Sequence, residues 1–234
     1  MTPGARAQAA IDLLAALFTA GPGRGKPADA VANAFFRARR YIGAKDRGAV
    51  AGVVYGVLRR RAQLDWWLAR ARAAAGLAPV SPDARARVIA HLALADGWTA
   101  ERIAAAFDGG RFRPSGVNPH ERAVLALLDG STLNHPEQPL DVRGNFPAWL
   151  EPELTRRFGA RIEAELAAVA APASLDLRGT RLKATREEAS GLLAAEGVRA
   201  LPTPLSPVGL RVEGRPPLAA TSVFREGLVD GQDE

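Results

Sequence analysis

Apolar residues recur at helical spacing through the first 130 residues of the chain. Ile11, Leu14 and Phe18 form the first stripe, which predicts a helix over residues 7–20 that ends at Gly21-Pro22-Gly23. Later stripes of the same period predict helices that start near Pro27, Asp46, Leu64, Ser81, Thr99 and Asn118. A series of short helices without a visible repeat predicts a globular helical bundle.

Capping residues mark several of the expected helix ends. Asp46 is expected to cap the third helix, and the arginines at 59–61 end it where cations complement the helix dipole. Asn118 followed by Glu121 has the spacing of a capping box. Trp67 lies on the apolar stripe of its helix, so we expect it in the core.

The pattern changes after residue 128. Glycine and proline interrupt the helical period, so residues 136–146 are expected to form a linker. Two more helical stripes follow at 149–158 and 162–170, and the first of them places Trp149 on a packed face.

The last part of the chain mixes strand and helix signals. Apolar and polar residues alternate at 174–183, and a second strand is expected at 208–213. Between them, Thr185 and Glu188 form a second capping-box pattern. The chain is therefore expected to be mainly α, with a helical domain in 1–135 and a small α+β domain in 147–234.

Charge is distributed unevenly along the chain. Residues 1–80 hold 13 Lys and Arg against 4 Asp and Glu, a net of +9, whereas the other 154 residues hold 18 against 21, a net of −3. Such asymmetry indicates a front half that faces a polyanion. The alternative is an ordinary solvated surface in an arginine-rich protein.

Composition and spacing exclude several kinds of chemistry. The sequence has no cysteine, which excludes disulfides, zinc–thiolate sites and a cysteine nucleophile. His91, His120 and His135 lack metal-ligand spacing and are expected at the surface or at helix ends. Acidic pairs such as Glu187-Glu188 are expected to be solvated charge. No apolar run approaches the roughly 20 residues that span a bilayer, so we expect a cytoplasmic protein without a membrane partner.

One stretch near the front of the chain resembles a known fold. Its residues are Lys45-Asp46-Arg47, then Val54-Tyr55-Gly56-Val57-Leu58-Arg59-Arg60, then Leu64-Asp65. They are similar to the NusB-like RNA-binding fold. This helical bundle is also found at the front of the bacterial small-subunit rRNA cytosine-C5 methyltransferases of the Sun, or RsmB, family.

Motifs in the second half resemble the same family more closely. They are Phe146-Pro147-Ala148-Trp149-Leu150, Arg157-Phe158-Gly159, Leu177-Arg178, Leu182-Lys183, Pro202-Thr203-Pro204-Leu205-Ser206-Pro207 and Gly209-Leu210-Arg211. The terminal Gln232-Asp233-Glu234 looks like the start of the family's cofactor-binding domain. The sequence departs from the family at Gly179-Thr180, where a Val-Asn pair is usual.

The resemblance implies the RNA-binding and substrate-targeting part of an S-adenosylmethionine-dependent rRNA (cytosine-C5) methyltransferase. In the family, the Rossmann-type catalytic domain follows, with a Gly-rich cofactor loop and two cysteines. A cysteine thiolate adds to C6 of the pyrimidine and activates C5, and this sequence has none. We therefore expect the chain to be inactive alone, without a cofactor, catalytic residue or metal site of its own.

The resemblance also implies partners and contact residues. The expected partners are small-subunit rRNA, the methyltransferase domain itself and, as a further candidate, a ribosomal protein. The candidate RNA-binding residues are Arg39, Arg40, Lys45, Arg47, Arg59, Arg60, Arg61, Arg178, Lys183, Arg186 and Arg211. Each has a structural alternative. The residues before position 62 could belong to an ordinary solvated surface, and Arg47 could also pair with Asp46 or Asp65. The last four could pair with Glu187, Glu188 or Glu213.

Two other functions remain open at this point. One is a free-standing NusB-like factor that assists transcription or ribosome assembly. The other is a protein-interaction module. Affinity for RNA should fall steeply with salt, whereas an apolar protein interface should not respond in this way.

Overall fold

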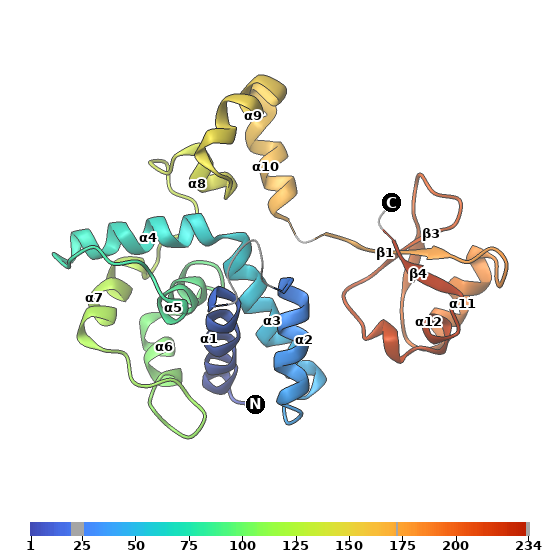
Figure 1. Ribbon diagram of the computed structural model, residues 1–234, viewed down its shortest axis with the longest axis horizontal. Coiled ribbons are helices and arrows are strands. Elements are labelled where there is room, and N and C mark those ends of the chain that lie inside the picture. The colour runs from blue at the N-terminus through green and yellow to red at the C-terminus, as the bar shows by residue number, and fades with distance from the viewer. Residues whose placement is uncertain (20–25, 172, 233–234) are drawn as a thin grey trace. The chain divides into compact units, whose positions relative to one another are not determined.

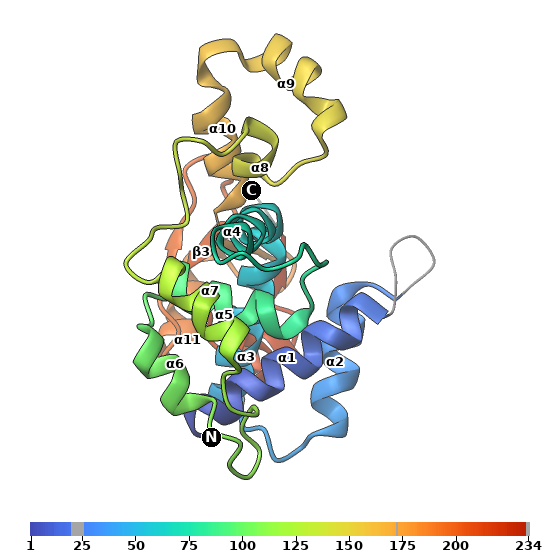
Figure 2. The same ribbon diagram turned by 90° about the vertical axis from the view of Figure 1, so that its left-hand side faces the viewer.

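The computed structural model describes residues 1–19, 26–171 and 173–232, and the fold is mainly α with a small α+β part, as expected. The chain divides into two compact units, Met1–Ala170 and Ala171–Glu234. Figures 1 and 2 show the helical first unit and the sheet of the second. The expected stop at Gly21-Pro22-Gly23 and the motif residues Asp233 and Glu234 lie outside the described residues.

The first unit is a bundle around α1, α3 and α5. Their packed faces carry Leu13, Val54 and Val88, whose side chains are fully buried. The helices are α1 (Pro3–Thr19), α2 (Ala28–Ala38), α3 (Ala44–Arg59), α4 (Arg61–Ala74), α5 (Ala84–Leu94), α6 (Ala100–Ala106), α7 (Pro119–Leu128), α8 (Leu140–Gly144), α9 (Glu151–Phe158) and α10 (Ile162–Ala170), with the 3-10 turns η1 (Ala148–Leu150) and η2 (Gly159–Arg161). Trp67 is buried, as its stripe predicted.

Side-chain hydrogen bonds cap several of the helix starts, among them those of α5, α6 and α7. The capping box predicted at Asn118 and Glu121 is present, with both bonds at 2.9 Å. The prediction for α3 is wrong, because the helix begins at Ala44 and Asp46 lies in its first turn. Instead of capping α3, the Asp46 carboxylate accepts hydrogen bonds from the N-terminal amine and from Arg6 Nε.

The segment before α9 packs on α4 rather than forming a free linker. The Trp67 indole N–H donates to the carbonyl of Leu133 at 3.0 Å. Further along, the Ala62 N–H at the start of α4 donates to Asn145 Oδ1 at 2.9 Å. Residues 136–146, predicted as the linker, therefore contain α8 and are anchored to the bundle, whereas the two compact units divide between Ala170 and Ala171.

Trp149 departs from its predicted position. Its side chain is 74% exposed, although its spacing suggested a packed face. The reason is the 3-10 turn η1, which has about three residues per turn instead of 3.6 and so rotates Trp149 away from the apolar stripe of α9.

The second unit is a four-stranded antiparallel sheet in the order β2-β3-β1-β4. Its elements are β1 (Leu175–Gly179), α11 (Arg186–Ala195), β2 (Ala200–Pro202), β3 (Gly209–Val212), η3 (Leu218–Ala220), α12 (Ser222–Arg225) and β4 (Val229–Gly231). Leu177, Leu210 and Val229 form its core with Leu193 of α11. The opposite face of the sheet carries Asp176 and alternate polar residues, because successive side chains point to opposite sides of a strand.

Candidate nucleic-acid interface

Basic side chains gather around the turn between α2 and α3. Arg40, Lys45 and Arg47 are exposed, and Arg39 is half-buried with its guanidinium 3.8 Å from the ring centre of Phe35. The sequence predicted RNA contacts for these four residues. Exposure makes Arg40, Lys45 and Arg47 accessible to phosphate.

Arg47 has a structural contact other than the one considered from the sequence. Its Nε donates to the carbonyl of Ile42 at 2.7 Å. Among the described residues it forms no ion pair, because Asp46 binds Arg6 and the N-terminus while Asp65 binds Arg87. The carbonyl contact orients the guanidinium without neutralising its charge.

The arginines at 59–61 occupy the corner between α3 and α4, but their environments differ. Arg61 is the most exposed and lies 3.7 Å from Asp65. Arg60 is half-buried, and the Nε of Arg59 is buried without a hydrogen-bond partner in the described part of the chain. The three therefore do not form one uniform cationic patch.

His91 lies beneath this corner, in the last turn of α5, and it is buried rather than at the surface. It is 3% exposed because α5 is buried on nearly all sides. Its ring fits against Gly56, where an added Cβ would come within 2.5 Å of the imidazole. Burial lowers the pKa of His91, Asp96 at 3.7 Å raises it, and the charges of Arg60 and Arg59 lower it further, so the net shift is downward.

The four basic residues predicted to contact RNA in the α+β unit each have a contact within that unit. Arg211 makes two bonds to Asp176, at 2.8 and 2.7 Å, and Arg178 lies 3.4 Å from Asp230. The Lys183 ammonium donates to the carbonyl of Glu226. Arg186 lies 3.1 Å from Glu187, which is the pairing that the structural alternative predicted for it. RNA contacts at these four residues would have to compete with these bonds.

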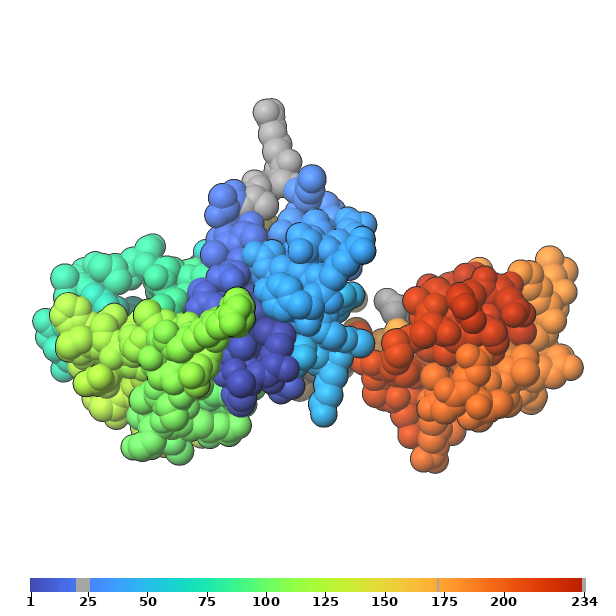
Figure 3. Space-filling model, turned by 90° about the horizontal axis from the view of Figure 1, so that it is seen from below, coloured from blue at the N-terminus to red at the C-terminus, as the bar shows by residue number. Residues whose placement is uncertain are grey.

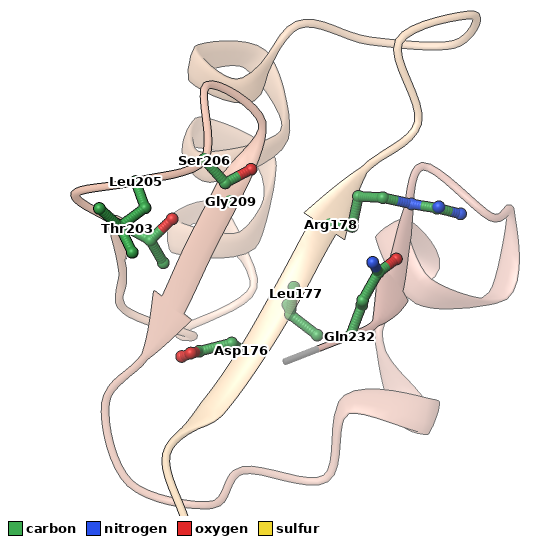
Figure 4. A pocket seen from close by; sticks show the side chains of 8 residues that line it. All are labelled: Asp176, Leu177, Arg178, Thr203, Leu205, Ser206, Gly209 and Gln232. Atoms are coloured by element: carbon green, nitrogen blue, oxygen red, sulfur yellow. The ribbon is translucent and has the colours of Figure 1, made fainter. Parts of the chain in front are cut away.

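A pocket of about 290 Å³ opens beside β1 and β3. Figure 4 shows Thr203, Leu205 and Ser206 on one side and Arg178 and Gln232 on the other. A side chain at Gly209 would come within 2.0 Å of the Thr203 hydroxyl, so only glycine fits there. The Thr203 hydroxyl is buried without a hydrogen-bond partner among the described residues.

The sequence did not single out this pocket. Thr203 and Gly209 belong to the family-like motifs of the sequence. The packing of a threonine on a glycine across a loop produces no periodic pattern in the sequence from which a pocket could be predicted. The pocket offers hydrogen-bonding groups and an apolar wall, which suit a polar ligand. It contains no nucleophile paired with a general base.

Two further findings concern the described residues as a whole. No group of three or more His, Asp or Glu side chains among them is placed to hold a metal ion. None of their helices is both long and apolar enough to cross a membrane.

Comparison with known proteins relates the second half of the chain to a class of enzymes. Residues 146–219 match the model of the ferredoxin-like domain of RsmF/B-like methyltransferases. The match supports a relationship to the rRNA methyltransferases.

A solved structure is similar in fold over the whole chain. It is the crystal structure of PH0851, with a TM-score of 0.63 and 18% sequence identity, and the match covers 100% of this chain. The chain spans about half of that protein's length, 54%. No curated protein matches the chain significantly.

Proposed function

We propose that the chain is the RNA-recognition part of an S-adenosylmethionine-dependent rRNA (cytosine-C5) methyltransferase of the Sun, or RsmB, type. The observation that carries this proposal is the match of residues 146–219 to a domain of RsmF/B-like methyltransferases. The net charge of +9 in residues 1–80 supports the same conclusion, because phosphate neutralisation supplies much of the affinity for nucleic acid.

In this proposal residues 1–135, which lie within the first unit, form a NusB-like domain that holds small-subunit rRNA by its backbone and shape. Structured RNA is recognised mostly in this way, since side chains cannot read its narrow major groove. The exposed cations near α2 and α3 provide the contacts. The reaction with rRNA would take place in the cytoplasm.

The chemistry itself belongs to a methyltransferase domain that we propose as the partner of these two units. S-adenosylmethionine would supply the methyl group there. The described residues do not fit this cofactor, because their sheet is antiparallel, whereas dinucleotide-type sites lie at the ends of parallel strands beside a Gly-rich turn. Without a cysteine, the chain also lacks the thiolate that would activate C5.

Competition binding tests the proposal. A labelled fragment of small-subunit rRNA is titrated with the chain, and unlabelled tRNA and duplex DNA of equal charge are used as competitors. We expect the rRNA fragment to be held at least tenfold more tightly than either competitor. Equal affinity for all three would indicate a nonspecific polyanion binder. Binding of a ribosomal protein without binding of RNA would favour the protein-interaction module.

A second readout concerns the cofactor. We expect calorimetry to show no saturable binding of S-adenosylmethionine to this chain. Micromolar binding would place the cofactor site within these residues. It would contradict the proposal that S-adenosylmethionine binds in a separate methyltransferase domain.

A further inference from the structure

Helices α2 and α3 leave a groove between them, because each packs on α1 rather than closely on the other. The groove has a volume of about 610 Å³ and is lined by Asp29, Ala30, Asn33, Phe36, Arg37, Arg47, Gly48 and Ala51. Figure 3 shows helices α1 to α3, in blue, forming one continuous surface of the helical unit.

The rim of the groove is cationic. Arg37 is exposed in the last turn of α2, and within the described residues it forms no ion pair. Arg47 is held from behind by the carbonyl of Ile42, which leaves its charge unneutralised. Asp29 is the one carboxylate in the lining, so the two guanidinium groups outnumber it.

One residue of the groove lining is a glycine within helix α3. Gly48 is exposed in α3, and an added Cβ would meet no atom within 4 Å. Internal packing therefore does not require glycine here, although glycine weakens a helix interior relative to alanine. Glycine at such a place allows another backbone to approach closely.

We propose, on the basis of the RNA-recognition function above, that this groove binds one sugar–phosphate strand of the RNA. Arg37 and Arg47 contact phosphates, Asn33 bonds to a ribose hydroxyl or phosphate oxygen, and Gly48 lets the strand lie against α3. A protein partner fits less well, because interfaces rely on large apolar anchors. Phe36, the one aromatic residue of the lining, is only 9% exposed.

The charge test replaces both arginines with a neutral residue of similar shape. In Arg37→Gln/Arg47→Gln we expect RNA affinity to fall about tenfold or more at low salt. The slope of log affinity against log salt should decrease by about 0.7–0.9 for each phosphate that the variant no longer neutralises. The matched control is Arg111→Gln/Arg122→Gln, which removes two exposed charges from outside the groove. We expect less than a twofold change for this control.

The shape test uses a pair of glycines in the same helix. Gly48→Gln should raise the thermal unfolding midpoint, because glutamine is a better helix former, and yet weaken RNA binding about fivefold. Gly52 is also exposed with open space around its Cβ, but it does not line the groove. Gly52→Gln should therefore stabilise the helix similarly and leave RNA affinity unchanged.

The outcomes separate this inference from the proposed function. If wild-type chain binds rRNA while both groove variants bind it equally well, the groove is not the site and the RNA-recognition function stands. If the wild type binds no RNA, both are overturned. If the groove variants instead lose an acidic protein partner and retain RNA, the surface is a protein interface and the inference is wrong.

Discussion

The side chain of Arg87 lies inside the helical unit, where it is 6% exposed, and the carboxylate of Asp65 balances its charge. The two bonds measure 2.7 and 2.9 Å, and the guanidinium lies 4.8 Å from the ring centre of Phe18. Removing one partner of a buried pair leaves a charge without compensation, which costs more than the pair contributes.

We therefore expect Asp65→Asn to lower the free energy of unfolding by about 2–4 kcal/mol, since Asp65 itself is partly solvated. Urea unfolding followed by circular dichroism measures the change. The control is Glu153→Gln, which breaks an exposed pair with Arg156 and should cost less than about 0.5 kcal/mol. Equal effects of the two variants would show that burial of Arg87 is not what makes Asp65 important.

The stability of the chain should also depend on pH through His91. Its folded-state pKa lies below the ordinary value of 6.5, so the unfolded chain binds a proton more readily than the folded chain. The contribution of His91 is then complete above about pH 6.5 and is lost as the pH falls from there through the lowered pKa. Asp46, whose carboxyl pKa is lowered by Arg6, titrates below this window.

The expected result is that the wild type loses stability between pH 7.5 and pH 5.5, and that His91→Gln loses much less. Unfolding midpoints in urea at several pH values give the comparison. A His91→Gln curve parallel to the wild type would mean that another group causes the dependence.

Single residues were predictable from the sequence where the signal was local. The capping residues Asn118 and Thr185 are bonded as predicted, because a capping box involves only the N-cap residue and the residue three positions after it. The prediction for Trp149 was wrong, and the burial of His91 was not expected. Burial at these two positions depends on the phase of a 3-10 turn and on the number of helices packed around α5. Those are properties of the assembled fold.

At the level of elements, the two capping boxes allow each unit to be destabilised separately. Loss of an N-cap hydroxyl or amide costs about 1 kcal/mol. Asn118→Ala should increase amide hydrogen exchange in α7 and its neighbours in Met1–Ala170, whereas Thr185→Ala should act in Ala171–Glu234. Exchange measured by mass spectrometry on the full chain distinguishes them. Faster exchange in both units for either variant would show that they unfold together.

Elements long enough to show several repeats of their period were predictable from the sequence, whereas strands of three residues were not. The stripes located α1 to α7, and alternation located β1 and β3. Strands β2 and β4 have three residues each, too few for an alternating pattern to appear. The anchoring of residues 131–147 on α4 was also missed, because it depends on long-range bonds such as that from Trp67 to Leu133.

At the scale of the whole molecule, the division between the units should be visible to proteases. Because residues 131–147 are bonded to α4, we expect a nonspecific protease under limiting conditions to cut first between Ala170 and Leu175. Mass spectrometry of the first fragments identifies the site. Early cleavage between Asp129 and Pro147 would instead support the linker position expected from the sequence.

Photo-crosslinking to small-subunit rRNA tests most directly whether both units recognise RNA. The RNA carries 4-thiouridine, and crosslinked peptides are identified at low and at high salt. We predict crosslinks in residues 26–51, which span the groove of α2 and α3, and in residues 178–186 of the α+β unit, with both sets weakened by salt. Crosslinks confined to other parts of the chain, or yields that do not change with salt, would contradict RNA recognition by these two surfaces.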